Sequence, residues 1–526
     1  MNLKTEWNNI GELLESAAAK HGPKPFFIFK DETFSFAYVN DHVNRLANGL
    51  VKLGLSKGDR VGVMLPNGVD FPISWMAIGK TGGIMVPVNI GYKEYDLEYV
   101  LADSGARFII LHSDFLEIFE KIKNKLGNLS TIIVVGSSPR EYLDYYDLIA
   151  RSSGNFTGSA VSKDDLVNIQ YTSGTTGFPK GCMLTHGYWL LLGKTSADYT
   201  NLRENDVDMT AQPFFYMDPQ WNTILCMLGG IPLVIMEKFS VTRFWPTVKK
   251  NNVTFFYVIG TMPFYLLKQA PNPELEQQHN LRVVMCSGIV PSFHETFEKR
   301  WNVPWREAFG MTETGVDLLV PIDDTESVGS GAMGAPVPTK KAKIIDTNGH
   351  ELNDGQVGEL VLSGQPMMLG YWNKPKETAV MIEDGWLHTG DLAYKDAKGY
   401  YHWTGRLKDM VRRTGENISS VEVESVLMEH AKIKIAAVVP VPDELRGEEV
   451  KVYVILTDGE TKASFPPESI LEFAASKLAR FKLPRYIEYV SDLPKTPSEK
   501  IAKHVLISEK SDLRSGSYDA EDKLWR

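Results

Sequence analysis

The chain repeatedly alternates short, β-rich apolar runs with helix-length amphipathic segments. One apolar run spans 60–65, a helical candidate follows over 71–79, and the next apolar run spans 84–88. The same alternation returns at residues 107–111, 131–135, 232–236 and 254–259. Apolar runs separated by helices are typical of parallel sheets, because parallel neighbours need a long crossover connection. The pattern therefore predicts an α/β fold with parallel-rich sheets.

The pattern changes near residue 341. Strand-like segments are joined there by short turns such as Asn348-Gly349 and Lys398-Gly399, which predicts a β-rich subdomain. After Gly405 the sequence is typical of a separate, small α+β unit. We therefore expect a large N-terminal domain over 1–405 and a small C-terminal domain over 406–526. The polar segment 508–526 is expected to be a loosely attached tail.

Charge and cysteine content exclude several classes of protein. The 526 residues include 56 Lys plus Arg and 66 Asp plus Glu, a net charge of −10, which argues against a nucleic-acid binder. Cys182, Cys226 and Cys286 lie far apart, so the sequence supports neither a disulfide framework nor a zinc knuckle. A secretory leader and a membrane-spanning apolar stretch are not expected, and a cytoplasmic location fits best. The residues leave homo-oligomerisation open.

A loop rich in hydroxyls and glycines, at 171–181, is the most informative segment. It follows the apolar run 166–170 and contains Thr172, Ser173, Gly174, Thr175, Thr176, Gly177 and Lys180. Glycines let backbone N–H groups approach phosphate oxygens, hydroxyls add donors, and Lys180 adds a cation, so the loop suits a polyphosphate. It is not a Walker A loop, because Phe178 and Pro179 separate Gly177 from Lys180.

The loop resembles the signature of the adenylate-forming superfamily, which includes acyl-CoA synthetases, adenylation domains and luciferases. Six further segments match family motifs in the right order and cover nearly the whole chain: 287–291, 309–313, 331–336, 385–391, 405–409 and 494–501. The resemblance implies an AMP-forming acid–thiol ligase with ATP, Mg²⁺ and coenzyme A as cosubstrates or cofactors. A carboxylate would attack ATP to give acyl-AMP and pyrophosphate, and a thiol would then displace AMP.

The resemblance also implies roles for individual residues. Lys500 would neutralise the α-phosphate, Glu313 would be the magnesium-linked carboxylate, and Thr172 would join them as a catalytic residue. Glu313 could instead cap the start of a helix. The remaining nucleotide-binding residues would be Ser287, Gly288, Phe309, Gly310, Met311, Thr312, Asp391 and Arg406. Phe309 would stack on adenine, and Asp391 would accept hydrogen bonds from the ribose.

Two positions would serve the second half-reaction. Lys408 falls at the family hinge, about which the C-terminal domain rotates between the two half-reactions. Gly415 would then line the tunnel for the pantetheine arm of coenzyme A without a side chain in the way.

Among subfamilies, the chain looks most like crotonobetaine/carnitine–CoA ligases. The implied acyl pocket contains Tyr216, Met217, Asp218, Trp221, Ile259 and Gly260. Asp218 with Trp221 nearby would suit a quaternary ammonium group, although Asp218 could equally cap a helix and Trp221 could be a core residue. Aryl acids and short- or medium-chain acids remain open as substrates.

Two residues depart from the family pattern. Glu499 precedes Lys500 where relatives usually have glycine, which places a negative charge beside the catalytic cation. Tyr216 stands where many relatives have histidine, and tyrosine cannot act as a base at neutral pH. The alternatives to a free-standing CoA ligase are an enzyme that loads a separate carrier protein and a nucleotide or acyl sensor without turnover.

Overall fold

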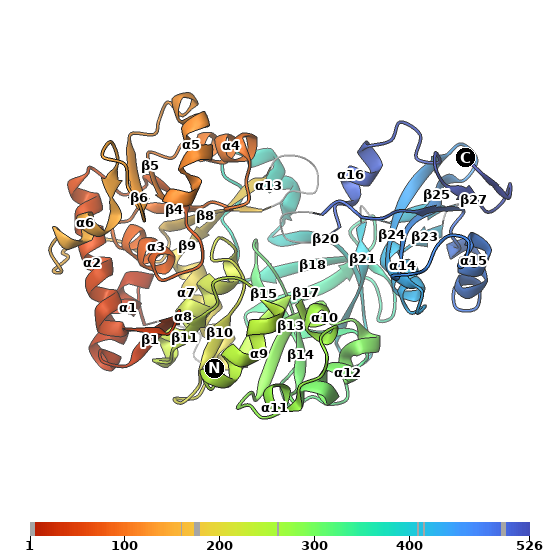
Figure 1. The fold of residues 1–526 in the computed structure, drawn as a ribbon, viewed down its shortest axis with the longest axis horizontal. Helices are drawn as coiled ribbons and strands as arrows, with labels where there is room; N and C mark the ends of the chain where they lie inside the picture. The colour runs from red at the N-terminus through yellow and green to blue at the C-terminus, as the bar shows by residue number, and fades with distance from the viewer. Residues whose placement is uncertain are drawn as a thin grey trace. The chain divides into compact units, whose positions relative to one another are not determined.

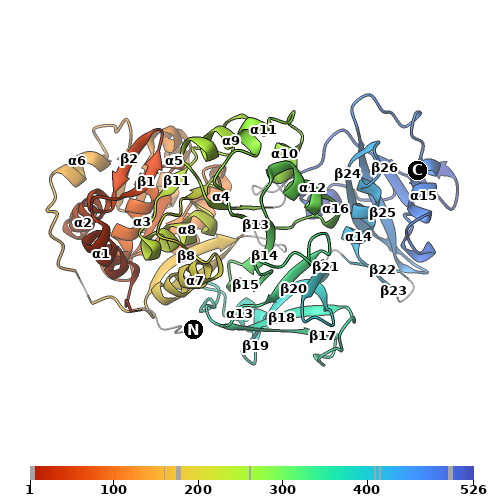
Figure 2. The ribbon, with the colours of Figure 1, turned by 90° about the horizontal axis from the view of Figure 1, so that it is seen from below.

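The computed structural model describes residues 6–158, 160–172, 179–259, 262–407, 410–413, 416–495 and 501–526. The chain divides into two compact units: unit 1 is Met1–Ala342 with Leu362–Leu387, and unit 2 is Lys343–Val361 with His388–Arg526. The chain therefore leaves unit 1, returns to it, and leaves it again. The expected domain boundary at 405/406 stays a prediction. The two ribbon views follow the chain from red to blue (Figure 1, Figure 2).

The first sheet of unit 1 is parallel over most of its width, as the alternating pattern predicts. Its strand order is β7 (Leu143–Asp144), β6 (Thr131–Val135), β5 (Phe108–His112), β3 (Arg60–Met64), β4 (Ile84–Pro87), β8 (Leu166–Thr172) and β9 (Lys180–Thr185). Only the β8–β9 pair is antiparallel, and it places the phosphate-loop segment between its two strands.

Helices cover both faces of this sheet (Figure 1). One face packs against α1 (Ile10–His21), α2 (Phe36–Lys52) and α3 (Asp70–Lys80), and the other against α4 (Glu94–Ser104) and α5 (Leu116–Ile122). Alternate residues of β5 show why: Phe108 and Ile110 join one core cluster, whereas Ile109 and Leu111 join the other. Successive side chains of a strand point to opposite faces of the sheet, so a continuous apolar run is buried under helices on both faces.

The second sheet of unit 1 has the order β16 (Ala332–Pro336), β15 (Gly315–Leu319), β14 (Trp305–Met311), β13 (Val283–Ser287), β12 (Phe255–Ile259), β10 (Asp208–Thr210), β11 (Leu233–Ile235), β1 (Pro25–Phe29) and β2 (Glu32–Ser35). Its strands from β10 to β14 are parallel. One face shares a core cluster with α7 (His186–Tyr199) and α8 (Met217–Gly229); the other packs on α9 (Val241–Lys250) and α12 (Pro291–Trp301).

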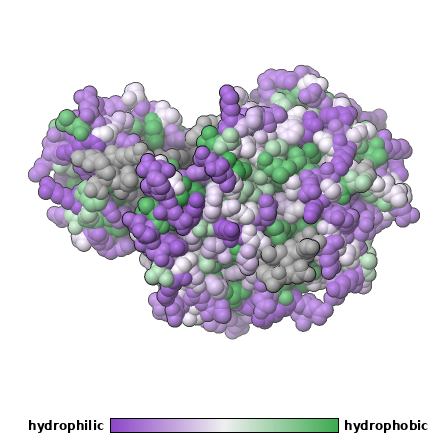
Figure 3. All heavy atoms as spheres, turned by 180° about the vertical axis from the view of Figure 1, so that it is seen from behind, coloured by the Kyte–Doolittle hydropathy of each residue, from purple (hydrophilic) through white to green (hydrophobic). Residues whose placement is uncertain are grey.

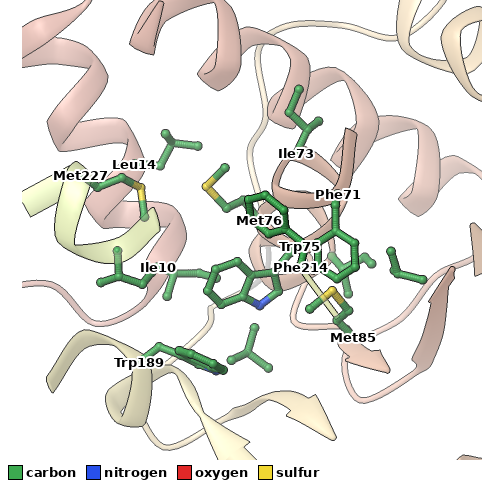
Figure 4. Packing of buried hydrophobic residues seen from close by; sticks show 14 of the residues in the cluster. Ile10, Leu14, Phe71, Ile73, Trp75, Met76, Met85, Trp189, Phe214 and Met227 are labelled. Carbon is green, nitrogen blue, oxygen red and sulfur yellow. The ribbon is translucent and has the colours of Figure 1, made fainter. Parts of the chain in front are cut away.

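Tryptophan packing joins α3 to α7 in the core of unit 1. The rings of Trp75 and Trp189 meet edge to face with 5.2 Å between centroids, and Phe214 lies close by (Figure 4). The indole N–H of Trp75 donates to Asn168 on β8 at 2.8 Å, and Asn168 donates to Gln220 of α8 at 2.8 Å. Because these polar groups are buried, any of them without a hydrogen-bond partner would cost free energy of folding. The strand before the phosphate loop is therefore tied to α8.

Unit 2 is built mainly from antiparallel pairs, as the turn signals predict. One group has the order β17 (Lys340–Ile345), β18 (Gly358–Gly364), β20 (Trp386–Lys395) and β21 (Tyr401–Arg406). The C-terminal sheet has the order β23 (Glu416–Ile418), β22 (Val411–Arg413), β25 (Gly447–Leu456), β26 (Tyr486–Tyr489), β27 (Tyr518–Asp519) and β28 (Leu524–Trp525), with β24 (Ile433–Asp443) beside β25. Helices α14 (Ser420–Met428) and α15 (Pro467–Ala475) pack on it.

The expectation of a loosely attached tail over 508–526 is wrong. Strand β27 pairs with β26, and β28 pairs with β27. The carboxylate of Asp519 is buried and accepts a 2.7 Å hydrogen bond from Arg526 Nε, and it also pairs with Arg485 at 3.3 Å. These partners are distant in sequence or lie in polar segments, so hydropathy alone does not reveal them.

Hydrophilic and apolar residues are intermixed on the side of the molecule seen in Figure 3. Leu445 and Val380 are among the exposed apolar side chains. Within the part of the chain that the structure describes, no helix has the length and apolar character needed to cross a bilayer.

Candidate active site

The two ends of the phosphate-loop segment are held opposite each other. Thr172 on β8 pairs with Lys180 on β9, and the Thr172 hydroxyl donates to the Lys180 carbonyl at 3.4 Å. An antiparallel pair with backbone hydrogen bonds fixes both ends of the segment that the sequence predicts to bind phosphate. Ser173, Gly174, Thr175, Thr176 and Gly177, the predicted phosphate-binding residues between them, lie outside the described residues.

Glu313 lies in the turn between β14 and β15, so it does not cap a helix. Its side chain is buried, and its Oε1 accepts a hydrogen bond from the Tyr371 hydroxyl at 2.8 Å. The thiol of Cys182 is buried as well, and burial followed by the charge of Glu313 raises the pKa of this thiol. The structure therefore connects Glu313 through Tyr371 to Lys180 on β9, and the role of Glu313 at magnesium stays a prediction.

Tyr371 was not identified from the sequence. Its hydroxyl contacts Glu313, and the Lys180 ammonium lies over its ring at 5.0 Å from the centroid. Neither periodicity nor motif spacing singles this residue out. The only local feature of the sequence that marks Tyr371 is its position between Gly370 and the aromatic Trp372. In the structure, Gly370 adopts a φ of 130°.

The segment after β13 is fixed by a buried carboxylate. Glu307 on β14 accepts the backbone N–H groups of Gly288 at 2.6 Å and Ile289 at 2.7 Å. Burial raises the pKa of Glu307 to about 8, although the two N–H donors favour its ionised form. The Tyr257 hydroxyl donates to Ser287 Oγ at 2.7 Å. Ser287 and Gly288, both predicted to bind nucleotide, are thus held in a defined backbone conformation.

A cavity of about 80 Å³ opens in unit 1 between α7, α8 and the second sheet. Its lining combines several predicted residues with others from α7 and the sheet: Leu192, Ser196, Tyr199, Thr200, Met217, Asp218, Trp221, Tyr257, Met285, Ser287, Ala308, Phe309, Gly310, Gly315, Val316 and Leu319. Tyr216 and Ile259 are not part of this lining, and Gly260 lies outside the described residues. Residues of α7 were not foreseen, because only tertiary packing brings this helix to the cavity.

Asp218 and Trp221 lie one turn apart on α8 and face the cavity together. The indole N–H of Trp221 donates to Asp218 Oδ1 at 3.4 Å. The Trp221 ring meets Tyr257 edge to face at 5.6 Å between centroids. A carboxylate beside two aromatic rings gives this part of the cavity a negative electrostatic character.

Within unit 2, Asp391 and Arg406 are cross-strand partners on β20 and β21. Arg406 Nε lies 2.8 Å from Asp391 Oδ1, and the indole N–H of Trp403 donates to the same oxygen at 2.9 Å. Asp391 is only 1% exposed. The pair predicted to bind the ribose end of the nucleotide is therefore preorganised within this unit.

The residues predicted for catalysis and domain rotation, Lys500, Lys408 and Gly415, lie outside the described residues, as does Glu499. Neighbours of two of these segments are described. The backbones of Lys495 and Ile501, on either side of Lys500, form an antiparallel bridge. The backbones of Arg413 and Glu416, on either side of Gly415, are partners in the β22–β23 strand pair.

Comparison with known proteins identifies the class. Residues 14–372 match the AMP-binding enzyme family, and residues 422–500 match the AMP-binding enzyme C-terminal domain. The chain is 32% identical to a crotonobetaine/carnitine–CoA ligase of Proteus mirabilis, over 95% of this chain and 98% of that protein.

Solved structures agree with this comparison. The anthranilate CoA ligase AuaEII in complex with anthranoyl-AMP has a TM-score of 0.88 and 27% identity, over 97% of this chain and 99% of that one. ATP-bound MatB from Rhodopseudomonas palustris has a TM-score of 0.88 and 26% identity, over 97% of this chain and all of that one.

The fold and site define an adenylate-forming enzyme, and the chain belongs to the AMP-binding enzyme family. It is an ATP-dependent, AMP-forming ligase that joins a carboxylic acid to coenzyme A through an acyl-adenylate.

Magnesium, which accompanies ATP in this family, fits the residues present. The buried Glu313 carboxylate offers a hard oxygen ligand, and its hydrogen bond from Tyr371 engages Oε1, which leaves lone pairs on both oxygens. Bound Mg²⁺ would supply positive charge to the phosphate oxygens.

Proposed function

We propose that this ligase activates a small carboxylic acid with a cationic group, of the carnitine or crotonobetaine kind, in the cavity beside Asp218. The observation that carries the proposal is the joint presence of Asp218, Trp221 and Tyr257 in the cavity lining. An ammonium group gains Coulomb attraction from the carboxylate and cation–π contact from the rings. A carboxylic acid without a cationic group would gain no attraction from the charge of Asp218. The printed name of the Proteus mirabilis relative supports the same substrate class.

In the first half-reaction, a substrate carboxylate oxygen forms a bond to the α-phosphorus of ATP. The bond from that phosphorus to the β-phosphate bridging oxygen breaks, and pyrophosphate leaves with the electron pair. Two anions approach each other in this step, so catalysis depends on positive charge and oriented donors. We assign this task to Lys500 at the α-phosphate and to the loop residues Thr172, Ser173, Gly174, Thr175, Thr176, Gly177 and Lys180 at the other phosphates.

The nucleoside contacts are assigned residue by residue. We assign Ser287, Gly288 and the segment Phe309, Gly310, Met311 and Thr312 to the adenine side, Asp391 and Arg406 to the ribose side, and Glu313 to Mg²⁺. Two buried hydrogen bonds support these assignments, the one that Glu307 accepts from the Gly288 N–H and the one that Glu313 accepts from the Tyr371 hydroxyl, because they fix the two unit 1 segments before ligand arrives.

In the second half-reaction, the thiolate of coenzyme A attacks the acyl carbon and AMP leaves with the electron pair of the broken acyl–oxygen bond. We assign Gly415 to the pantetheine path and Lys408 to the hinge of a C-terminal domain over 406–526. We place the reaction in the cytoplasm; Cys182, Cys226 and Cys286 are all free and buried, which supports a reducing compartment.

The test measures pyrophosphate release from MgATP with carnitine-type betaines, aryl propenoates and straight-chain acids, each with and without coenzyme A. We expect turnover with the betaines that requires coenzyme A. Asp218→Asn should raise KM for a betaine by about 10-fold and leave KM for any acid without a cationic group unchanged. Asp354→Asn, which disrupts an exposed ion pair with Lys395, is the matched control.

Other outcomes would contradict the proposal in different ways. Turnover of aryl or alkyl acids alone would overturn the substrate class, while the ligase chemistry would stand. Adenylation that ends in transfer only to a phosphopantetheinylated protein would identify a carrier-loading enzyme. ATP binding without turnover across the panel would identify a sensor.

A further inference from the structure

Tyr371 contacts two charged groups with two different parts of its side chain. Its hydroxyl donates to Glu313 Oε1 at 2.8 Å, and its ring faces the Lys180 ammonium at 5.0 Å from the centroid. Both Tyr371 and Glu313 are buried, with 5% and 7% of their surface exposed. Limited access to water strengthens both contacts.

The backbone around Tyr371 is fixed to the strand that leaves the phosphate loop. Tyr371 forms an antiparallel bridge with Cys182 of β9. The backbone N–H of Trp372 donates to the Gly181 carbonyl at 2.8 Å, and the N–H of Tyr371 donates to Thr378 Oγ1 at 2.9 Å. The ring therefore has a defined location relative to both Lys180 and Glu313.

A hydrogen bond to one carboxylate oxygen restricts how the carboxylate rotates. With Oε1 engaged by the tyrosine hydroxyl, the Glu313 carboxylate keeps one orientation and its Oε2 remains able to bind a cation. Groups that orient a metal ligand in this way commonly govern metal affinity nearly as strongly as the ligand itself. The ring face acts similarly on Lys180, since it stabilises an ammonium group held over it.

We propose that Tyr371 is a positioning residue that orients Glu313 toward Mg²⁺ and Lys180 toward the phosphates, and so sets the affinity for the metal–nucleotide complex. The inference rests on the proposed role of Glu313 as the magnesium-linked carboxylate. Tyr371 acts through these two side chains and not on the reacting atoms.

The experiment compares two substitutions that separate the functions of the side chain. Tyr371→Phe removes the hydroxyl and keeps the ring, whereas Tyr371→Leu removes both. The matched control is Tyr518→Phe, because Tyr518 is also buried and also donates to a carboxylate, Glu468, at 2.6 Å. Binding of Mn²⁺ to the full-length protein with ATP, without any acid substrate, is followed by electron paramagnetic resonance. Steady-state KM for MgATP and kcat are measured separately.

We expect Tyr371→Phe to raise the Mn²⁺ dissociation constant by about 10-fold. Tyr371→Leu should add a further factor of about 3 by weakening the hold on Lys180. KM for MgATP should rise with the dissociation constant, while kcat at saturating metal and ATP stays within about twofold, and Tyr518→Phe should bind as wild type. Wild-type Mn²⁺ affinity in Tyr371→Phe, with only a lower melting temperature, would show a merely structural role and overturn the inference.

Glu313→Gln, measured in parallel, separates this inference from the proposed function. If Glu313→Gln weakens Mn²⁺ binding and Tyr371→Phe does not, the positioning role fails and the metal role stands. If Glu313→Gln leaves Mn²⁺ binding unchanged, the metal role itself fails. The double variant should bind Mn²⁺ no more weakly than Glu313→Gln alone, because the tyrosine hydroxyl acts through that carboxylate.

Discussion

Lys340 Nζ and Asp317 Oδ1 lie 3.2 Å apart, and neither side chain has any exposed surface. Lys340 also donates to the Thr314 carbonyl at 2.7 Å, and the Thr314 hydroxyl donates to Asp317. The ion pair therefore holds both the main chain and the side chain of Thr314, the residue after Glu313. Removing one charge of a buried pair leaves the other uncompensated, which is far more costly than losing a surface pair.

Lys340→Met should therefore lower the free energy of unfolding by about 3–5 kcal/mol, measured by denaturant titration. The control Lys395→Met removes a partly exposed pair with Asp354 and should cost about 1 kcal/mol or less. Equal losses in the two variants would mean that the Lys340–Asp317 pair is not a strong local constraint.

Glu307→Gln should weaken ATP binding, because an amide cannot accept hydrogen bonds from both Gly288 and Ile289 through its two terminal atoms. Its NH₂ group would face one of these N–H donors, at a cost of about 1–3 kcal/mol. We expect KM for ATP to rise by about 10-fold. Glu424→Gln is the control, since Glu424 also accepts a backbone N–H, from Val438, at 2.6 Å. A comparable rise in KM for that variant would indicate a general loss of stability.

The buried imidazole of His186 should make stability depend on pH. Burial lowers the pKa of His186 from 6.5 to about 3, and its Nδ1 accepts the backbone N–H of Ile10 at 3.3 Å. The unfolded chain therefore takes up a proton below about pH 6.5 that the folded chain does not. The contribution of neutral His186 is complete above about pH 6.5 and declines as pH falls toward 3, by about 1.4 kcal/mol per unit.

The comparison of wild type with His186→Gln isolates this contribution. Between pH 6 and 5, urea unfolding of the wild type should lose stability more steeply than the variant does. His350→Gln, at an exposed histidine that is 79% accessible in its side chain, should keep the wild-type slope. Parallel pH profiles for wild type and His186→Gln would contradict the assignment.

Lys500→Ala should abolish acyl-AMP formation, because the first half-reaction needs positive charge at the α-phosphate. Transfer from preformed acyl-AMP to coenzyme A should remain. The control Lys503→Ala removes a nearby lysine that pairs with Glu424 at 2.7 Å, and it should affect both half-reactions alike or not at all. Equal loss of both half-reactions in Lys500→Ala would contradict the role assigned to this lysine.

The alternation of apolar runs and helices predicted the α/β fold correctly, because burial on both faces leaves a clear trace in the sequence of strands such as β3 and β5. The same reasoning failed for 508–526. Those residues are polar, and strand β27 is held by its pairing with β26 and by the ion pair of Asp519 with Arg485, both of which are contacts between residues distant in sequence.

Motif order singled out Glu313, but it gave no indication of its hydrogen-bond partner Tyr371, which is 58 residues further along the chain. The cavity shows the same limit. Asp218 and Trp221 were predicted as lining residues, whereas Tyr199 and Thr200 reach the cavity only because α7 packs beside α8. Tertiary contacts of this kind have no local sequence pattern.

The division of each unit into two stretches of chain affects how the protein could be dissected. Unit 1 resumes at Leu362 after unit 2 has begun at Lys343. A single cut by a protease, wherever it falls, therefore cannot release two fragments that each contain one complete unit. Separating the units would require cuts near 342, 361 and 387. After a single cut, the two fragments would each depend on the other for a complete core.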